Sequence, residues 1–95
     1  MSAYRTSLQV RFTGNTETVV VPGPIAVHGY SANVGSSGTL TAKDAGQAGG
    51  GSTAKWVLDA TAGVTKDLFG ERFESGLSLQ GSAAGTDVTV FYDKA

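Results

Sequence analysis

Hydrophobic and polar residues alternate along much of this chain with the two-residue period of a strand that has one buried face. Leu8, Val10 and Phe12 begin the pattern, and it is clearest at residues 87–92. No segment of ten residues has the three-to-four-residue spacing of an amphipathic helix. The pattern therefore predicts an all-β protein.

Turn signals divide the pattern into short segments. Gly14-Asn15 and Pro22-Gly23-Pro24 interrupt it early, and glycine and serine fill residues 35–38. Leu68, Phe69 and Phe73 also fit one helical turn, but we interpret their segment as extended. Seven or eight short strands, with a turn every 8–12 residues, are typical of an antiparallel sandwich or small barrel. The expected strands are residues 8–12, 16–21, 25–34, 39–43, 55–59, 66–73, 77–80 and 87–92.

The third expected strand has a local irregularity. By simple alternation, Ile25 and Val27 face one way, and His28 and Tyr30 face the other. Gly29 interrupts the strand and marks an expected bulge. The third and fourth strands flank a short turn, so we expect them to pair as a hairpin.

The whole chain, residues 1–95, is expected to form a single domain. Residues 44–53 contain four glycines and resemble a linker. The segments on either side are too short for independent cores, so we interpret this stretch as an exposed Gly-rich loop. Residues 1–24 are either an N-terminal arm or edge strands.

Composition and charge narrow the functional classes. The chain has 14 glycines, no cysteine and a net charge of −1. These values exclude disulfide scaffolds and thiolate metal sites, and they give nucleic-acid binding little electrostatic support. No apolar run reaches the length of a membrane-spanning helix, and residues 1–5 lack the blocks of a signal peptide. We therefore expect a soluble protein that has no membrane or nucleic-acid partner.

Catalytic motifs are weak in this sequence. His28 is the single histidine, and Ser31 lies three residues further on. Asn33 occupies the place of the second glycine of a Gly-x-Ser-x-Gly nucleophile motif. We expect no enzyme activity, although a small hydrolase with polar groups around His28 stays an alternative.

Acidic residues give no strong site either. Glu71 and Glu74 are interpreted as an exposed charged turn rather than a glycosidase pair. The glycine-rich segment lacks a Gly-Lys-Ser or Gly-Lys-Thr phosphate motif. We expect no cofactor and no metal, with a calcium site built from separate loops left open. The aspartates are scattered singly at Asp44, Asp59, Asp67, Asp87 and Asp93.

Aromatic residues are the candidate interaction residues. A sugar-stacking platform is one use of such side chains, and a core or subunit interface is the other. We favour the core or interface interpretation. The candidates are Tyr4, Tyr30, Trp56, Phe69, Phe73 and Tyr92.

The second half of the chain resembles small structural proteins of tailed-bacteriophage virions. The resemblance is carried by residues 52–59, by the sequence Phe-Glu-Ser-Gly-Leu-Ser-Leu-Gln-Gly at 73–81, and by Asp-Val-Thr-Val-Phe-Tyr at 87–92. Residues 25–43 look like the paired strands that precede these segments in such proteins. The similarity covers about residues 25–92 and leaves the first 24 outside.

The resemblance implies a compact, jelly-roll-like β-sandwich, often a homotrimer. It implies a capsid decoration, cement or head-fibre protein that is made in the host cytoplasm and becomes part of the virion. Its expected partners are other copies of itself and a major capsid or other virion protein. The alternative is a carbohydrate- or receptor-binding module on the virion surface or tail. No individual functional residues follow from the resemblance, because such proteins act through surfaces.

Overall fold

The computed structural model describes residues 8–47 and 54–94 of the chain. These residues form strands joined by turns and loops, which confirms the all-β prediction. The strands are β1 (Leu8–Thr13), β2 (Thr18–Pro22), β3 (Ile25–Ala32), β4 (Thr39–Asp44), β5 (Ala54–Asp59), β6 (Thr65–Phe73), β7 (Gly76–Gly81) and β8 (Asp87–Lys94).

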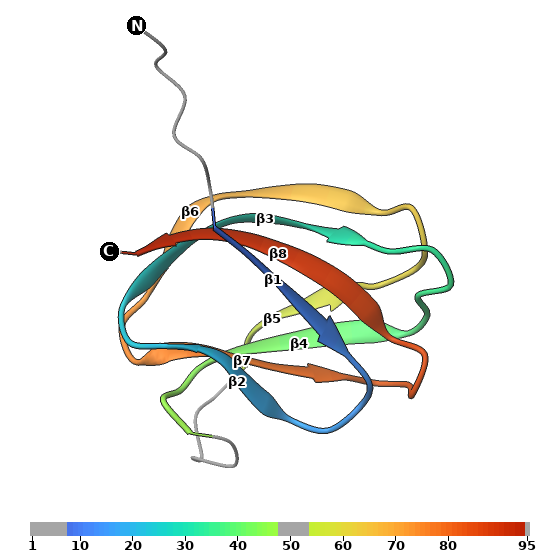
Figure 1. Cartoon of the computed structure of the whole chain (residues 1–95), viewed down its shortest axis with the longest axis horizontal. Helices are drawn as coiled ribbons and strands as arrows, with labels where there is room; N and C mark the ends of the chain where they lie inside the picture. The colour runs from blue at the N-terminus through green and yellow to red at the C-terminus, as the bar shows by residue number, and fades with distance from the viewer. Residues whose placement is uncertain (1–7, 48–53, 95) are drawn as a thin grey trace, which may run out of the picture.

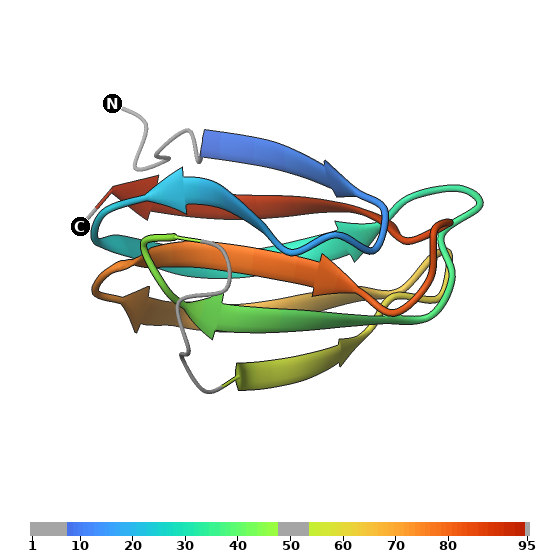
Figure 2. The same cartoon turned by 90° about the horizontal axis from the view of Figure 1, so that it is seen from below.

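The strands form two antiparallel sheets that pack face to face (Figure 1). The first sheet has the order β1-β8-β3-β6, and the second has the order β2-β7-β4-β5. Strands β1 and β2 therefore lie at one edge of the sandwich, and β5 and β6 lie at the other (Figure 2). The region that was expected to be an arm or edge strands supplies the edge strands β1 and β2, and residues 1–7 lie outside the described residues.

The pairing of the strands is nested. β1 pairs with β8, β2 with β7, β3 with β6, and β4 with β5. The pairs β3–β8 and β4–β7 then join these ladders into two four-stranded sheets. This is the strand order of an eight-stranded jelly roll. The predicted jelly-roll-like β-sandwich is confirmed.

The predicted hairpin between the third and fourth strands is wrong. β3 belongs to the first sheet, and β4 belongs to the second. The turn between them carries the chain across the sandwich instead of back along the same sheet. A short Gly-rich turn therefore did not distinguish a hairpin from a crossing between sheets.

The core lies between the inward faces of the two sheets. Alternate residues of β7 and β8 supply part of it, with Leu77, Leu79, Val88 and Val90 all buried. In β8 the residues between them are partly exposed, as expected for a strand with one solvated face, whereas β7 is buried on both faces, with Ser78 fully covered. The local alternation in the sequence thus indicates which face of β8 is buried.

The predicted bulge in β3 is present, and it changes the direction of Tyr30. From Val27 to Gly29, β3 advances two residues while β8 advances one, from Tyr92 to Phe91. The extra residue reverses the alternation beyond it. Tyr30 is therefore buried on the same side as Ile25 and Val27, so the prediction that it faces the other way is wrong.

Candidate interaction surface

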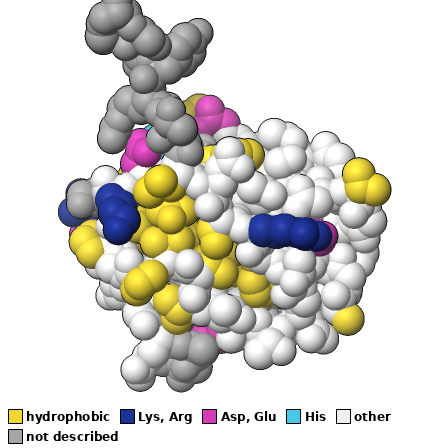
Figure 3. Space-filling view, in the orientation of Figure 1, with side chains coloured by type: hydrophobic (Ala, Val, Ile, Leu, Met, Phe, Trp, Pro, Cys, Tyr) yellow, Lys and Arg dark blue, Asp and Glu magenta, His cyan; other side chains and the backbone are white. Residues whose placement is uncertain are grey.

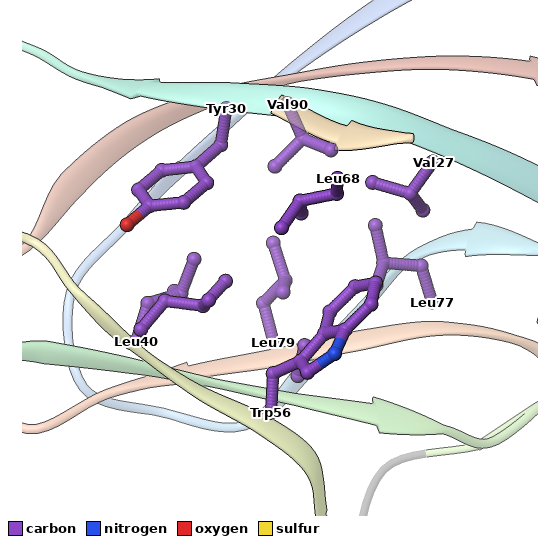
Figure 4. Close-up of a pocket in the computed structure, with 10 residues that line it drawn as sticks. Val27, Tyr30, Leu40, Trp56, Leu68, Leu77, Leu79 and Val90 are labelled. Carbon is purple, nitrogen blue, oxygen red and sulfur yellow. The ribbon is translucent and has the colours of Figure 1, made fainter. Parts of the chain in front are cut away.

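A small, partly open apolar cavity lies between the two sheets (Figure 4). Tyr30, Leu40, Trp56, Leu68 and other apolar side chains line it. Its volume of about 10 Å³ is enough for a single water molecule. Pockets that bind small molecules are about 300–1,000 Å³, so this cavity is a packing defect rather than a ligand site.

The candidate aromatic residues separate into buried and exposed groups. Tyr30 and Phe73 are fully buried, and the Tyr30 hydroxyl donates a 2.8 Å hydrogen bond to the Asp59 carbonyl oxygen across the sandwich. Burial, with a smaller contribution from the Asp59 charge, raises the pKa of the Tyr30 hydroxyl. Trp56 is partly buried and packs edge-on against Phe73, with ring centroids 5.3 Å apart. These three residues belong to the core.

The other three candidates lie elsewhere. Tyr92 is partly buried at the edge of the core. Phe69 projects from β6 and is 88% exposed. Tyr4 lies outside the described residues. The described candidates therefore form no shared sugar-stacking platform, and Phe69 is the one among them whose ring is almost fully exposed.

The exposure of Phe69 follows from a bulge in the edge strand β6. Between Val27 and Gly29, β3 advances two residues, whereas β6 advances four, from Glu71 back to Asp67. The two additional residues of β6 cannot pair with β3 and are pushed out of the ladder. Phe69 lies at the centre of this projection.

The backbone of the projection is unusual. Phe69 has a φ of 56° and Gly70 a φ of 73°. The left-handed region disfavours side chains with a Cβ, and a bulky residue there costs about 1–2 kcal/mol. The Asp67 carboxylate accepts a 2.7 Å hydrogen bond from the Phe69 backbone N–H and so holds the turn. The chain thus presents a large apolar ring in a defined position despite the strain.

Two glutamates near β6 each form an ion pair with a cation. The Lys55 ammonium contacts the Glu71 carboxylate at 2.9 Å and lies 4.7 Å from the centre of the Phe73 ring. Glu74 accepts a 2.7 Å bond from the Arg72 guanidinium, which raises the pKa of Arg72. The two glutamates therefore each bind a cation on the surface instead of facing each other across a cleft. Both glutamates are exposed as predicted, but only Glu74 lies in the turn, because Glu71 belongs to β6.

The β6–β7 turn is fastened to the second sheet by Asp44. Its carboxylate accepts backbone hydrogen bonds from Glu74 at 2.9 Å and Ser75 at 2.7 Å. Burial raises the pKa of Asp44, but these bonds, a third from Gly76 and the Lys55 charge outweigh it and lower the pKa overall. One side chain thus links the end of β4 to the turn that follows the Phe69 projection.

His28 forms a polar pair with a residue far along the sequence. Its Nε2 atom lies 2.8 Å from the Asp93 carboxylate, which ties β3 to β8 on the outer face of the first sheet. The hydroxyl of Ser31 lies 3.2 Å from that of Thr65. The carboxylate that a hydrolase would use to orient its histidine is present, but Ser31 bonds to another residue. A catalytic triad would need all three groups in one chain of hydrogen bonds.

Asp87 links three segments at the opposite end of β8. The Arg11 guanidinium donates bonds of 2.9 and 2.6 Å to the two carboxylate oxygens, and the Asn33 amide donates one of 2.8 Å. These bonds lower the pKa of Asp87 to about 2, against a small opposing effect of burial. The bidentate contact joins the edge strand β1 to β8.

Because the pKa of Asp87 is lowered in the folded chain, we expect the protein to lose stability in acid. The pKa of this carboxylate rises from about 2 in the folded chain to 3.8 on unfolding, so its contribution is complete above pH 4 and is lost as the pH falls to 2. Because the Arg11 side chain is 66% exposed, we expect screening to reduce this contribution to about 1 kcal/mol. Urea unfolding of Asp87→Asn should show that loss at pH 7 and a smaller further decrease than wild type between pH 4 and pH 2. An unchanged acid dependence in the variant would contradict this role.

Among residues 8–47 and 54–94, no group of three or more histidine, cysteine or acidic side chains is placed to hold a metal ion. The described part of the chain also contains no helix long and apolar enough to cross a membrane. The Gly-rich loop predicted at residues 44–53 is described only in part, because residues 48–53 lie outside the described ranges.

Comparisons with known proteins identify no relative. No family model matches the chain, and neither the curated proteins nor the solved structures include a match. The candidate surface therefore rests on the geometry of this chain.

Three exposed apolar residues were not predicted as interaction residues. Leu8 is 43% exposed at the start of β1, Val57 is 66% exposed on β5, and Val34 is 98% exposed in the β3–β4 loop. Single apolar residues on a surface are common and carry no signal in a sequence. Leu8 differs from the other two because it pairs with Tyr92, a partly buried residue that packs against the core. This neighbour becomes known only when the pairing of β1 with β8 is known.

Proposed function

We propose that this chain is a structural protein of a bacteriophage virion, a capsid decoration, cement or head-fibre component. In this proposal it catalyses no reaction and needs no cofactor. It is made in the host cytoplasm, assembles as a homotrimer and contacts a major capsid protein or another virion protein.

The observation that carries the proposal is the nested order of the eight strands. Double-sheet jelly rolls are a recurrent architecture of viral capsid proteins. The sequence resemblance over residues 25–92 points to the same class of protein. A fold alone does not define a function, so the accessible residues of the edges supply the second line of support.

Those edges suit a protein that acts through contacts. β6 presents Phe69 in a defined position, and β1 begins with the exposed Leu8. A small domain without disulfides gains stability when its edges and apolar positions are buried by neighbours. Many copies on one particle also let weak contacts add together.

The alternative is a carbohydrate- or receptor-binding module, since lectin domains also use jelly rolls. A stacking platform needs exposed aromatic faces, and the burial of Tyr30 and Phe73 removes two of the candidates. Trp56 and Tyr92 remain partly accessible. This alternative predicts saturable binding to a glycan array that Trp56→Ala abolishes in a folded variant.

Mass spectrometry of particles purified by density gradient tests the proposal. We expect peptides of this chain in the intact particle, at a constant ratio to the major capsid protein from one preparation to the next. The matched control is the soluble fraction of the same lysate, which identifies carry-over. Absence from intact particles would refute the proposed function.

A further inference from the structure

Phe69 forms an apolar knob on one edge of the sandwich. Its ring is almost fully exposed, and its backbone is held in the left-handed region by the hydrogen bond that its N–H donates to the Asp67 carboxylate. The formal charges of β6 sum to zero, because Lys66 and Arg72 balance Asp67 and Glu71. The knob therefore stands on a strand without net charge. Burying Phe69 against an apolar surface would not bring an excess charge of β6 into that contact.

The opposite edge has an apolar surface that we call the β1–β2 seam, formed by Leu8, Val10, Val20 and Tyr92. Leu8 pairs with Tyr92 across β1 and β8, while Val10, Val20 and Tyr92 pack on the core but remain partly exposed. Figure 3 faces this edge and shows hydrophobic side chains gathered on its left half. The one cation of β1, Arg11, is already paired with Asp87. The seam thus offers an apolar contact area that the other described residues leave partly exposed.

We propose that Phe69 of one copy packs into the β1–β2 seam of a second copy of this chain. β1 and β6 are the two outer strands of the same four-stranded sheet, so the knob cannot reach the seam of its own chain. Each copy therefore carries one apolar projection and one apolar acceptor that only another molecule can join. The proposal rests on the self-association in the proposed function and names the residues that produce it.

The geometry of this contact is heterologous. Each copy uses one edge to bind the next copy and the opposite edge to be bound, as in a head-to-tail arrangement. Such contacts form a closed ring when the rotation between copies closes, and a filament when it does not. An isologous contact of knob against knob would need no seam, so variants of the seam distinguish the two arrangements.

Sedimentation equilibrium of matched variants tests the contact. Phe69→Asn and Phe69→Gly remove the ring with residues that adopt the left-handed conformation readily, and Leu8→Asp places a charge in the seam. We expect wild type to sediment as multiples of the 9.6 kDa chain and each variant to weaken association at least about 30-fold. Val34→Asp makes the same kind of change at an exposed site in the β3–β4 loop, outside both edges of the contact, and should leave association unchanged.

Circular dichroism and thermal unfolding establish that every variant is folded. A mixture of Phe69→Asn and Leu8→Asp then tests the direction of the contact. The first variant keeps its seam and the second keeps its knob, so the mixture should form a 1:1 heterodimer and stop there. A mixture that stays monomeric, or a Leu8→Asp variant that associates like wild type, would overturn the proposal.

A wild-type chain that remains monomeric up to about 1 mM would also overturn it. This solution result is independent of whether the chain is found in particles. A monomeric chain that is present in virions would refute the contact and the proposed homotrimer, and would leave the proposed role as a virion protein intact. A chain that associates in solution but is absent from virions would keep the contact and refute the proposed role as a virion protein.

Discussion

Replacing Phe73 with alanine is expected to destabilise the chain by about 3–5 kcal/mol. Phe73 is fully buried, and its ring contacts both the Trp56 ring and the Lys55 ammonium. The substitution removes apolar burial and leaves a cavity where the two sheets meet near β5 and β6. Since small domains have about 5–15 kcal/mol of total stability, much of the folded state would be lost. Urea unfolding followed by tryptophan fluorescence measures the change.

The matched control is the same substitution at the exposed phenylalanine. Phe69→Ala removes an equal number of atoms from a side chain that contacts little of its own molecule. Its effect on unfolding should stay within about 0.5 kcal/mol when the protein is dilute enough to be monomeric. Equal losses for Phe73→Ala and Phe69→Ala would contradict the assigned positions of the two rings.

Replacing Gly81 with alanine is expected to cost about 3 kcal/mol or more. A Cβ at this position would overlap the Gly14 carbonyl oxygen and would lie 2.6 Å from the Thr86 Cβ. Both neighbours are held by the hydrogen bond from the Gly14 N–H to the Thr86 carbonyl oxygen, at 2.8 Å. Neither Gly14 nor Thr86 can move away without opening the turns that join β1 to β2 and β7 to β8. Thermal unfolding should show a large decrease in the midpoint.

Gly46→Ala is the control for this prediction. Its new Cβ would lie 3.3 Å from the Ser75 carbonyl oxygen, a tight contact that small shifts relieve. We expect a loss of less than about 1 kcal/mol. If the two glycine variants unfold at the same temperature, the close packing around Gly81 is not the cause.

The parts of the fold that depend on local alternation could be predicted from the sequence. Val88 and Val90 are buried as their two-residue period indicates, and the segment at residues 66–73 is extended as interpreted. Gly29 also marks a bulge as expected. These features depend on neighbouring residues in the chain, which a single sequence contains.

The misplaced features depend on pairing between distant strands. Tyr30 turns inward because the register with β8 shifts by one residue between Val27 and Gly29. Gly29 marked the bulge in the sequence, but simple alternation did not include its effect on the residues that follow. The false hairpin has the same origin, since the partners of β3 are β6 and β8. A turn sequence alone does not tell which sheet the next strand joins.

The candidate surface was only partly predictable. Phe69 was among the candidate aromatic residues, but its sequence position did not distinguish a core residue from an exposed one. Its projection requires the two unpaired residues of β6, which become visible only against the register of β3. The β1–β2 seam likewise exists because β1 and β2 come together at one edge. The sequence therefore identified Phe69 as a candidate, whereas the β1–β2 seam could be identified only from the folded structure.

Electron cryo-microscopy of the purified particle tests the central claim most directly. The account predicts repeated density on the particle that fits this eight-stranded jelly roll, with the β6 edge of one copy against the β1–β2 edge of the next. Density at the position of Phe69 would then lie within the neighbouring seam. A complete reconstruction in which every density belongs to other chains would contradict the claim that this protein is part of the virion.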